Sequence, residues 1–234
     1  IEQYVEFTNG LKLDVGEVVG NTNDEDLRRI QIRETIHSHL DKEARLFKRG
    51  IKTLSLFFID EVVKYKNYEA KDDKGTYALI FEEEYENIVR DRLVDTMLDQ
   101  DYRNYLKREL NSIDKVHSGY FSVDKKGKMI NSKIKRGSEA SDDISAYDLI
   151  MKNKERLLSF EEPVRFIFSH SALKEGWDNP NVFQIATLRQ SSSDIKKRQE
   201  IGRGLRLSIN QNGERQDAQV LGENEVQQLN TLTI

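Results

Sequence analysis

Three short segments of the chain have the length and the apolar character of buried strands: KTLSLFFID at 52–60, VRFIFS at 164–169 and VFQIATL at 182–188. Continuous apolar runs of this length are typical of strands that are covered on both faces, as in a parallel sheet. Helical patterns lie between and around them, at 24–47, 145–160 and 195–205. Because strands alternate with helices, the sequence predicts an α/β domain with a mostly parallel sheet.

The segments outside this alternation predict further elements. Alternating residues on both sides of Asn9-Gly10 indicate a leading hairpin within residues 1–20. The helix that follows can be capped by Thr22, Asn23 or Asp24 and stopped at Gly50. Residues 62–145 change character and read as an insertion, which the family resemblance described below bounds at 66–144, with a charged helix over 82–110 and a weak hairpin around Lys126-Gly127. Tail strands are expected around 219–221 and 230–234.

Composition excludes several classes of protein. The 234 residues carry 37 Lys and Arg against 41 Asp and Glu, a net charge of −4, which argues against a protein that coats nucleic acid by bulk charge. The absence of cysteine excludes disulfides, thiol nucleophiles and cysteine zinc sites. No metal site is predicted from the four histidines, and no run of about 18 apolar residues predicts a membrane span. The start lacks both a signal peptide and an initiator Met, so we expect a piece of a longer protein.

The stretch KKRQEIGRGLRL is the richest in candidate functional residues. On a helix, Gln199, Gly202, Arg203 and Arg206 share one face, because they are spaced at three and four residues. Two rigidly held guanidinium groups suit a triphosphate, since their planar forks match phosphate oxygens and stay charged at pH 7. A basic helix face that only meets solvent explains the same pattern, and the spacing alone does not decide between the two.

A second candidate stretch is SHSALKEGWDNPNV, which predicts a tight turn at Gly176 and Asn179-Pro180. Asp178 falls in this turn, at the mouth of the sheet where α/β folds bind ligands, and can accept a hydrogen bond from a ribose hydroxyl. An aspartate that only stabilises its own turn is the alternative. Trp177, the single tryptophan, is read as a packing residue.

Together the two stretches resemble motifs V and VI of superfamily 2 helicases and translocases. The second matches the Q-x-x-G-R-x-x-R signature at Gln199, Gly202, Arg203 and Arg206. A more specific resemblance is to the Res subunit of type III restriction enzymes, and it is carried by the segments EGWDNPNVFQI, RQEIGRGLRL and IKTLSLFFID. The leading hairpin, the IHSHLDKE helix and VHSGYFSVDKKG also resemble that family, so the resemblance covers nearly the whole chain.

The resemblance implies the second RecA-like domain of an ATP-dependent DNA translocase, formed by residues 21–65 and 145–234. Arg203 and Arg206 would reach the γ-phosphate as arginine fingers, and Gln199 would orient within the same site. Gly176, Asp178 and Gly202 would bind the nucleotide, with Gly176 and Asp178 also coupling the ribose to the DNA track. Ser169 and Ser171 are candidates for contacts with DNA phosphates.

The same resemblance implies ATP and Mg²⁺ as cofactors, double-stranded DNA and a modification methyltransferase subunit as partners, and a cytoplasmic location. The chain has no G-x-x-x-x-G-K-S/T sequence, so the first RecA-like domain would bind most of the nucleotide. Asp60-Glu61 mimics an acidic pair that holds Mg²⁺, but no phosphate-binding strand precedes it and we reject that assignment. No nuclease centre is visible, and the isolated chain is expected to be inactive.

Two other functions remain open. The chain fits the second domain of a superfamily 2 helicase that has no nuclease, because motifs V and VI are shared across that superfamily. It also fits a non-catalytic RecA-like module that docks a protein partner.

Overall fold

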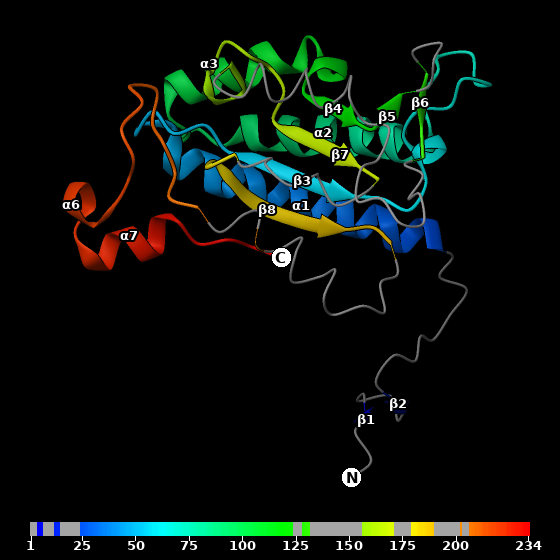
Figure 1. Ribbon diagram of the computed structural model, residues 1–234, viewed down its shortest axis with the longest axis horizontal. Coiled ribbons are helices and arrows are strands. Elements are labelled where there is room, and N and C mark those ends of the chain that lie inside the picture. The colour runs from blue at the N-terminus through cyan, green and yellow to red at the C-terminus, as the bar shows by residue number, and fades with distance from the viewer. Residues whose placement is uncertain are drawn as a thin grey trace, which may run out of the picture.

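The computed structural model of the chain describes residues 4–6, 12–14, 24–123, 128–131, 156–170, 179–189, 202 and 206–234. Its centre is a four-stranded sheet in the order β4 (His117–Tyr120), β7 (Phe166–Ser169), β3 (Leu54–Phe58) and β8 (Val182–Thr187) (Figure 1). All three neighbouring pairs are parallel. This α/β domain, with a parallel sheet flanked by helices, confirms the predicted fold class and is consistent with a RecA-like fold.

Helix α1 (Asp24–Phe47) leads into the central strand, and its predicted acidic first turn and glycine stop are confirmed, while the candidate caps Thr22 and Asn23 lie outside the described residues. Three acidic residues occupy its first turn, where they complement the helix dipole. At the other end Gly50 has φ +66°, its N–H donates to Phe47, and the Ile51 N–H donates to Leu46. This pattern is a Schellman motif, in which a glycine takes the left-handed conformation that ends the helix.

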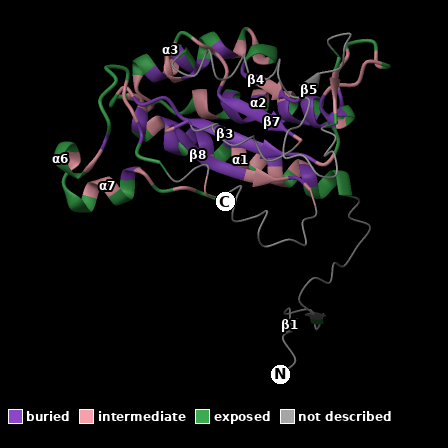
Figure 2. Ribbon diagram, viewed as in Figure 1, coloured by how far each residue is buried: buried purple, intermediate pink, exposed green. Residues whose placement is uncertain are grey.

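One face of the sheet packs against α1, α2 (Thr76–Val94) and α3 (Gln100–Leu110). Ile32, Ile36 and Leu40 recur every four residues on α1 and are fully buried against this face. Strand side chains such as Phe57 and those of the helices form one aromatic-rich core, which Figure 2 shows as the buried centre of the domain (Figure 2). The helices therefore fix the sheet from the α1 side.

The opposite face of the sheet has a smaller, mostly aliphatic cluster that includes Leu54, Leu56, Ile167 and Ile185. Leu157 of the short helix η3 (Arg156–Leu158) and Leu232 near the end of the chain also pack there. At the edge of the sheet, Thr233 forms a parallel bridge with Gln184. The predicted tail strand over 230–234 is therefore represented in the structure by a single bridge.

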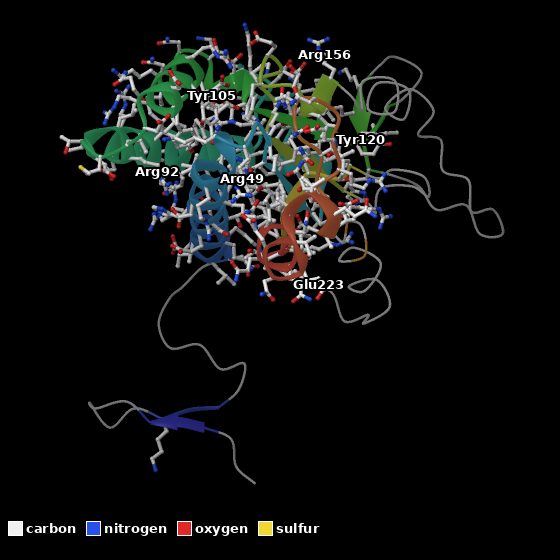
Figure 3. All side chains as sticks on the ribbon, turned by 90° about the vertical axis from the view of Figure 1, so that its left-hand side faces the viewer. Arg49, Arg92, Tyr105, Tyr120, Arg156 and Glu223 are labelled. Carbon is white, nitrogen blue, oxygen red and sulfur yellow. The ribbon has the colours of Figure 1, made fainter. Side chains whose placement is uncertain are left out.

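Helix α7 (Glu223–Leu229) lies beside the carboxyl-terminal end of α1, and Figure 3 labels its first residue, Glu223, and Arg49, which follows α1 (Figure 3). Leu229 and Leu46 share a small buried cluster, and Arg49 forms an ion pair with Glu225. The predicted strand at 219–221 is wrong, because α6 (Ala218–Leu221) forms there. The Asp217 side chain caps this helix by accepting hydrogen bonds from the Gln219 and Val220 N–H groups.

The predicted charged helix over 82–110 is two helices, because the chain turns between α2 and α3 and Asp99 caps α3 with its side chain. Strand β4 and both helices fall within residues 66–144, which the sequence assigns to an insertion, and they contribute to the same sheet and core as the rest. The boundaries of the insertion stay a prediction. The 310-helices η1 (Val62–Lys64) and η2 (Ile113–Lys115) complete this part.

Both predicted hairpins are confirmed as antiparallel pairs. They are β1 (Tyr4–Glu6) with β2 (Lys12–Asp14), and β5 (Ser122–Val123) with β6 (Met129–Ile130). Of the predicted helix over 145–160, residues 145–155 lie outside the described residues. Within the described part of the chain, no helix combines the length and the apolar character that a membrane crossing needs.

Candidate nucleotide and nucleic-acid site

Three neighbouring strands end at the same edge of the sheet. Phe58, the last residue of β3, pairs with Ser169 of β7 on one side and with Thr187 of β8 on the other. Along the chain, the sequence that resembles motif V follows β7 and the sequence that resembles motif VI comes after β8, and both strands end at this carboxyl edge. Ligands of open parallel sheets bind at this edge, because the loops that follow the strands gather there.

Ser169 is the one candidate DNA-contacting residue that the structure describes. Its carbonyl accepts a hydrogen bond from the Ile59 N–H at 2.8 Å, and the residue is only 1% exposed. The residue lies at the carboxyl edge, and its burial means that a phosphate reaches the hydroxyl only if neighbouring groups move. Ser171, Gly176 and Asp178 lie outside the described residues.

The motif VI residues are described in part. Gln199 and Arg203 lie outside the described residues, Gly202 lies in a turn, and Arg206 lies in a bend. Nη1 of the exposed Arg206 donates to the Gly202 carbonyl at 3.4 Å. This hydrogen bond places the two residues next to each other, while the rest of the helix predicted over 195–205 lies outside the described residues. An exposed guanidinium at this position can bind an anion that is presented by another domain.

The end of the motif VI segment is held at the opposite, amino edge of the sheet by residues that the sequence analysis missed as site residues. Asn181 immediately precedes β8, and its side chain forms two hydrogen bonds of 2.8 Å with the backbone of Ile209. Asn230 accepts a hydrogen bond from the Ser208 N–H, also at 2.8 Å. The repeated asparagines of Asn179-Pro180-Asn181 were read as turn residues alone, so no sequence signal pointed to a partner in the 206–209 region.

Arg189 is a second residue that the sequence analysis missed. It follows β8, and its Nη1 donates to the carbonyl of His170 at 2.9 Å. Its guanidinium also lies over the ring of Phe58, 5.9 Å from the centroid. Arg189 therefore connects the ends of β8, β7 and β3 at the carboxyl edge of the sheet. The only sequence signal was an arginine directly after an apolar strand.

Asp60-Glu61 follows β3 at the same edge and is engaged by a neighbouring lysine. Lys64 forms an ion pair with Asp60 and lies 3.8 Å from Glu61, and the Tyr77 hydroxyl donates to Asp60 at 3.4 Å. Burial alone would lower the pKa of Lys64, but its hydrogen bond with Asp60 and the charges of Tyr77, Asp60 and Glu61 together outweigh burial and raise this pKa. In the described ranges no group of three or more His, Asp or Glu side chains is placed to hold a metal ion.

A buried charged network lies between α1 and the amino edge of the sheet. Glu43 accepts hydrogen bonds from Arg165 at 2.6 Å and from the Tyr102 hydroxyl at 2.9 Å. Although burial alone would raise the pKa of Glu43, the charge of Arg165 and the hydrogen bond with His39 hold it well below its usual value. Burial also lowers the pKa of His39, whose Nδ1 lies 2.8 Å from the Ser55 hydroxyl. The network joins helix to strands, and its full enclosure makes it part of the scaffold.

His117 belongs to another enclosed set. Its Nδ1 lies 2.8 Å from the hydroxyl of Tyr65, and its Nε2 lies 3.1 Å from Glu82. Lys74 pairs with the other oxygen of Glu82 at 2.6 Å. Burial would raise the pKa of Glu82, but the hydrogen bonds from His117 and Lys74 lower it. This set joins β4 to α2 and the 62–75 segment, away from the carboxyl-edge residues.

Comparison with known proteins identifies relatives of one kind. The chain is 40% identical over 208 residues to the Res subunit of the type III restriction-modification enzyme EcoP15I of Escherichia coli, across 88% of this chain and 20% of that protein. It is 40% identical over 210 residues to the EcoPI Res subunit of Escherichia phage P1, and 37% identical over 234 residues to the StyLTI Res subunit of Salmonella typhimurium. These matches cover 88% and 89% of this chain and 20% and 22% of the two relatives, respectively.

The chain therefore spans about a fifth of the length of the curated relatives that it matches. A scan of known protein-family models finds no match to the chain. The identity over most of the chain, together with the parallel sheet, shows that the protein is homologous to a portion of type III restriction enzyme Res subunits.

Proposed function

We propose that the chain is the second RecA-like motor domain of a type III restriction enzyme Res subunit, an ATP-dependent enzyme that moves along double-stranded DNA and cuts it. The observation that carries this proposal is the identity of about 40% to Res subunits over nearly nine-tenths of the chain. The order of the two motif segments after β7 and β8 of a parallel sheet supports it. In this proposal residues 21–65 and 145–234 form the motor domain, and residues 66–144 are the family-specific insertion.

The motor domain completes an ATP site that lies mainly on the first RecA-like domain, which also holds the Mg²⁺ ion. Arg203 and Arg206 supply positive charge to the γ-phosphate, and Gln199 orients groups in the same site. Arg206 is exposed, as a side chain that reaches a nucleotide on another domain must be. Its guanidinium suits the charge that develops on the transferred phosphoryl group, and such an arginine contributes about 10³–10⁵-fold to the rate of phosphoryl transfer.

Nucleotide and DNA meet at the carboxyl edge of the sheet. Gly176, Asp178 and Gly202 contribute to nucleotide binding, with Asp178 accepting from a ribose hydroxyl, while Ser169 and Ser171 contact DNA phosphates. The modification methyltransferase subunit is the protein partner, and the bacterial cytoplasm is where such an enzyme meets its DNA. The strands that precede the two motif segments end at one edge of the sheet, which favours a site where nucleotide and DNA affect each other.

The assignment is tested by ATP hydrolysis in the intact Res subunit with its methyltransferase partner. Arg203→Ala or Arg206→Ala should reduce kcat by about 10³-fold or more while ATP binding is retained. Arg90→Ala is the matched control, because Arg90 is exposed on α2 and pairs with Glu86 within the same helix. Normal hydrolysis by both arginine variants would show that these residues are not the fingers.

The isolated chain provides the second arm of the test. Without a phosphate-binding loop it should show no DNA-stimulated ATP turnover, so robust turnover would overturn the proposal. DNA binding should weaken as salt rises, since contacts with phosphates release counterions. Salt-independent binding by the intact subunit would instead favour a non-catalytic docking module.

A further inference from the structure

The end of the motif VI segment is held at the amino edge of the sheet, while β8 itself ends at the carboxyl edge, just before Arg189. Arg206, the last arginine of the motif, is separated by Leu207 alone from the backbone that is held at the amino edge. The holding residue at that edge is Asn181, directly before the first residue of β8. The described ends of the chain between β8 and Ile209 thus lie at the two ends of one strand.

The Asn181 side chain holds Ile209 by both of its backbone groups. Asn181 Nδ2 donates to the Ile209 carbonyl, and the Ile209 N–H donates to Asn181 Oδ1, each at 2.8 Å. Such a two-point contact fixes the orientation of the peptide as well as its distance. Asn181 is fully buried, so water does not compete for these bonds.

Neighbouring side chains hold the backbone of Asn181 and the backbone of the residue before Ile209. The Asn181 N–H donates to Oδ1 of Asn179 at 3.0 Å. One residue before Ile209, the Ser208 N–H donates to Asn230, whose own amide donates to the carbonyls of Gln216 and Val226. The backbone at 208–209 is therefore tied to the start of β8 and to the end of α7 at once.

We propose that Asn181 is a positioning residue for ATP hydrolysis, which acts by holding the end of the motif VI segment so that Arg206 reaches the γ-phosphate. This inference rests on the proposed function. Arg206 is exposed and has a long side chain, so its reach depends on where its backbone is anchored. Asn181 belongs to the stretch that resembles motif V, and it therefore connects the end of that stretch to the end of motif VI.

The test uses the intact Res subunit with its methyltransferase partner and ATP as the probe. Asn181→Ala should lower kcat for ATP hydrolysis by about 10- to 100-fold, since a misplacement of about 1 Å has an effect of that size. KM for ATP and the affinity for DNA should stay within about twofold, because the binding groups themselves remain. Asn210→Ala is the matched control: its side chain bonds only within the exposed 210–214 turn, and kcat should not change.

A double-variant cycle separates positioning from a general loss of structure. If Asn181 acts through Arg206, the Asn181→Ala/Arg206→Ala variant should hydrolyse ATP no more slowly than Arg206→Ala alone. Losses that multiply would mean that Asn181 acts elsewhere, and would overturn the inference. An unchanged kcat in Asn181→Ala would overturn it as well.

A second variant, with the same side-chain shape, guards against misfolding by cavity formation. Asn181→Asp keeps the acceptor for the Ile209 N–H but turns an oxygen in place of the donor towards the Ile209 carbonyl, so it should also lower kcat with the same KM. If Asn181→Ala does not fold, the Asn181→Asp variant and the Asn181→Asp/Arg206→Ala double variant provide the same test. If Arg206→Ala itself hydrolyses ATP normally, the arginine-finger proposal fails. If Arg206→Ala loses hydrolysis but the losses of the two single variants multiply in the double variant, only the positioning inference fails.

Discussion

The two faces of the sheet are stabilised by different kinds of contact. On the α1 face, the ring of Phe57 stacks on Phe168 with centroids 4.6 Å apart, and Glu43 and Arg165 form a fully enclosed ion pair. On the opposite face, Phe58 lies among aliphatic side chains such as Leu56 and Ile167. Aromatic and charged contacts have preferred geometries, whereas aliphatic packing has little directional preference.

We infer from this difference that the two faces of the sheet have separate roles. Directional contacts on the α1 side fix how helices and strands are placed, so this side is the rigid scaffold. The other side is covered by the short helix η3 and the end of the chain, and its Phe58 ring meets Arg189 at the carboxyl edge of the sheet. We expect variants on the α1 side to act mainly on stability.

The largest effect is expected from breaking the buried ion pair. Arg165→Met leaves the Glu43 carboxylate enclosed without its counter-ion, and removal of one partner of a buried pair costs about 3–5 kcal/mol. Calorimetric unfolding measures the loss. The Glu43→Leu/Arg165→Met variant is the control, because it removes both charges and should be more stable than Arg165→Met. A double variant that is less stable would mean that the pair itself, rather than the orphaned charge, carries the stability.

Phe57 and Phe58 are neighbours in β3 whose side chains lie on opposite faces of the sheet, so substitutions at these two positions compare the faces directly. Phe57→Ala should cost about 3–5 kcal/mol, as is usual for a buried phenylalanine. Phe58→Ala should cost less, by about 1 kcal/mol or more. Phe57 has three aromatic partners, in Phe81, Phe166 and Phe168, and each such pair contributes about 0.5–1.5 kcal/mol beyond its buried area, whereas Phe58 has the single cation–π contact with Arg189, which contributes about 0.5–1 kcal/mol. Denaturant unfolding of the two variants provides the measurement. Equal losses would show that the aromatic geometry adds nothing to burial.

The third prediction concerns Lys52, which precedes β3 and donates to the carbonyls of Ser159 and Glu162 beside η3. Burial, helped by the charge of Arg165, lowers the pKa of Lys52 to about 7. Between about pH 7 and its ordinary value of 10.5, the unfolded chain binds more protons than the folded one, so stability should rise with pH in this window. The slope is at most about 1.4 kcal/mol per pH unit.

Unfolding of the wild type and of Lys52→Met at several values between pH 7 and 10 isolates this contribution. The variant should lose the rise that Lys52 causes, and its profile should be flatter. Lys107→Met is the control, because Lys107 is exposed on α3 and its removal should leave the profile unchanged. Parallel profiles for wild type and Lys52→Met would contradict the prediction.

The smallest effect is expected at the end of α1. Gly50→Ala should cost about 1–2 kcal/mol, the usual penalty for a side chain in the left-handed region. A Cβ at this position meets nothing nearer than Gln211 Cγ at 3.6 Å, so crowding adds nothing. Gly213→Ala is matched to it, with φ +80° and open space around it. Thermal unfolding of the two variants measures the loss of stability. A much larger loss in Gly50→Ala than in Gly213→Ala would mean that Gly50 contributes more than its backbone conformation.

The sequence by itself determined the elements whose signals are local. The predicted elements include the apolar run at 54–58, the acidic first turn and terminal glycine of α1, and the two hairpins, which all depend on neighbouring residues. The order of motifs V and VI relative to β7 and β8 was also readable, because it depends only on sequence spacing. For the candidate site, the sequence named Ser169, Gly202 and Arg206, and the structure places each of them at or after the strands that were predicted.

Only the tertiary structure decided what depends on residues far apart in the chain. The break between α2 and α3 was missed because a helical apolar stripe continues across it, and β4 was missed because His117–Tyr120 has no apolar run. Glu43 meets Arg165, and Asn181 meets Ile209, across long loops that no local pattern encodes. A buried polar side chain needs a partner, but the sequence does not say which one, because the partner is selected by the packing of the whole domain.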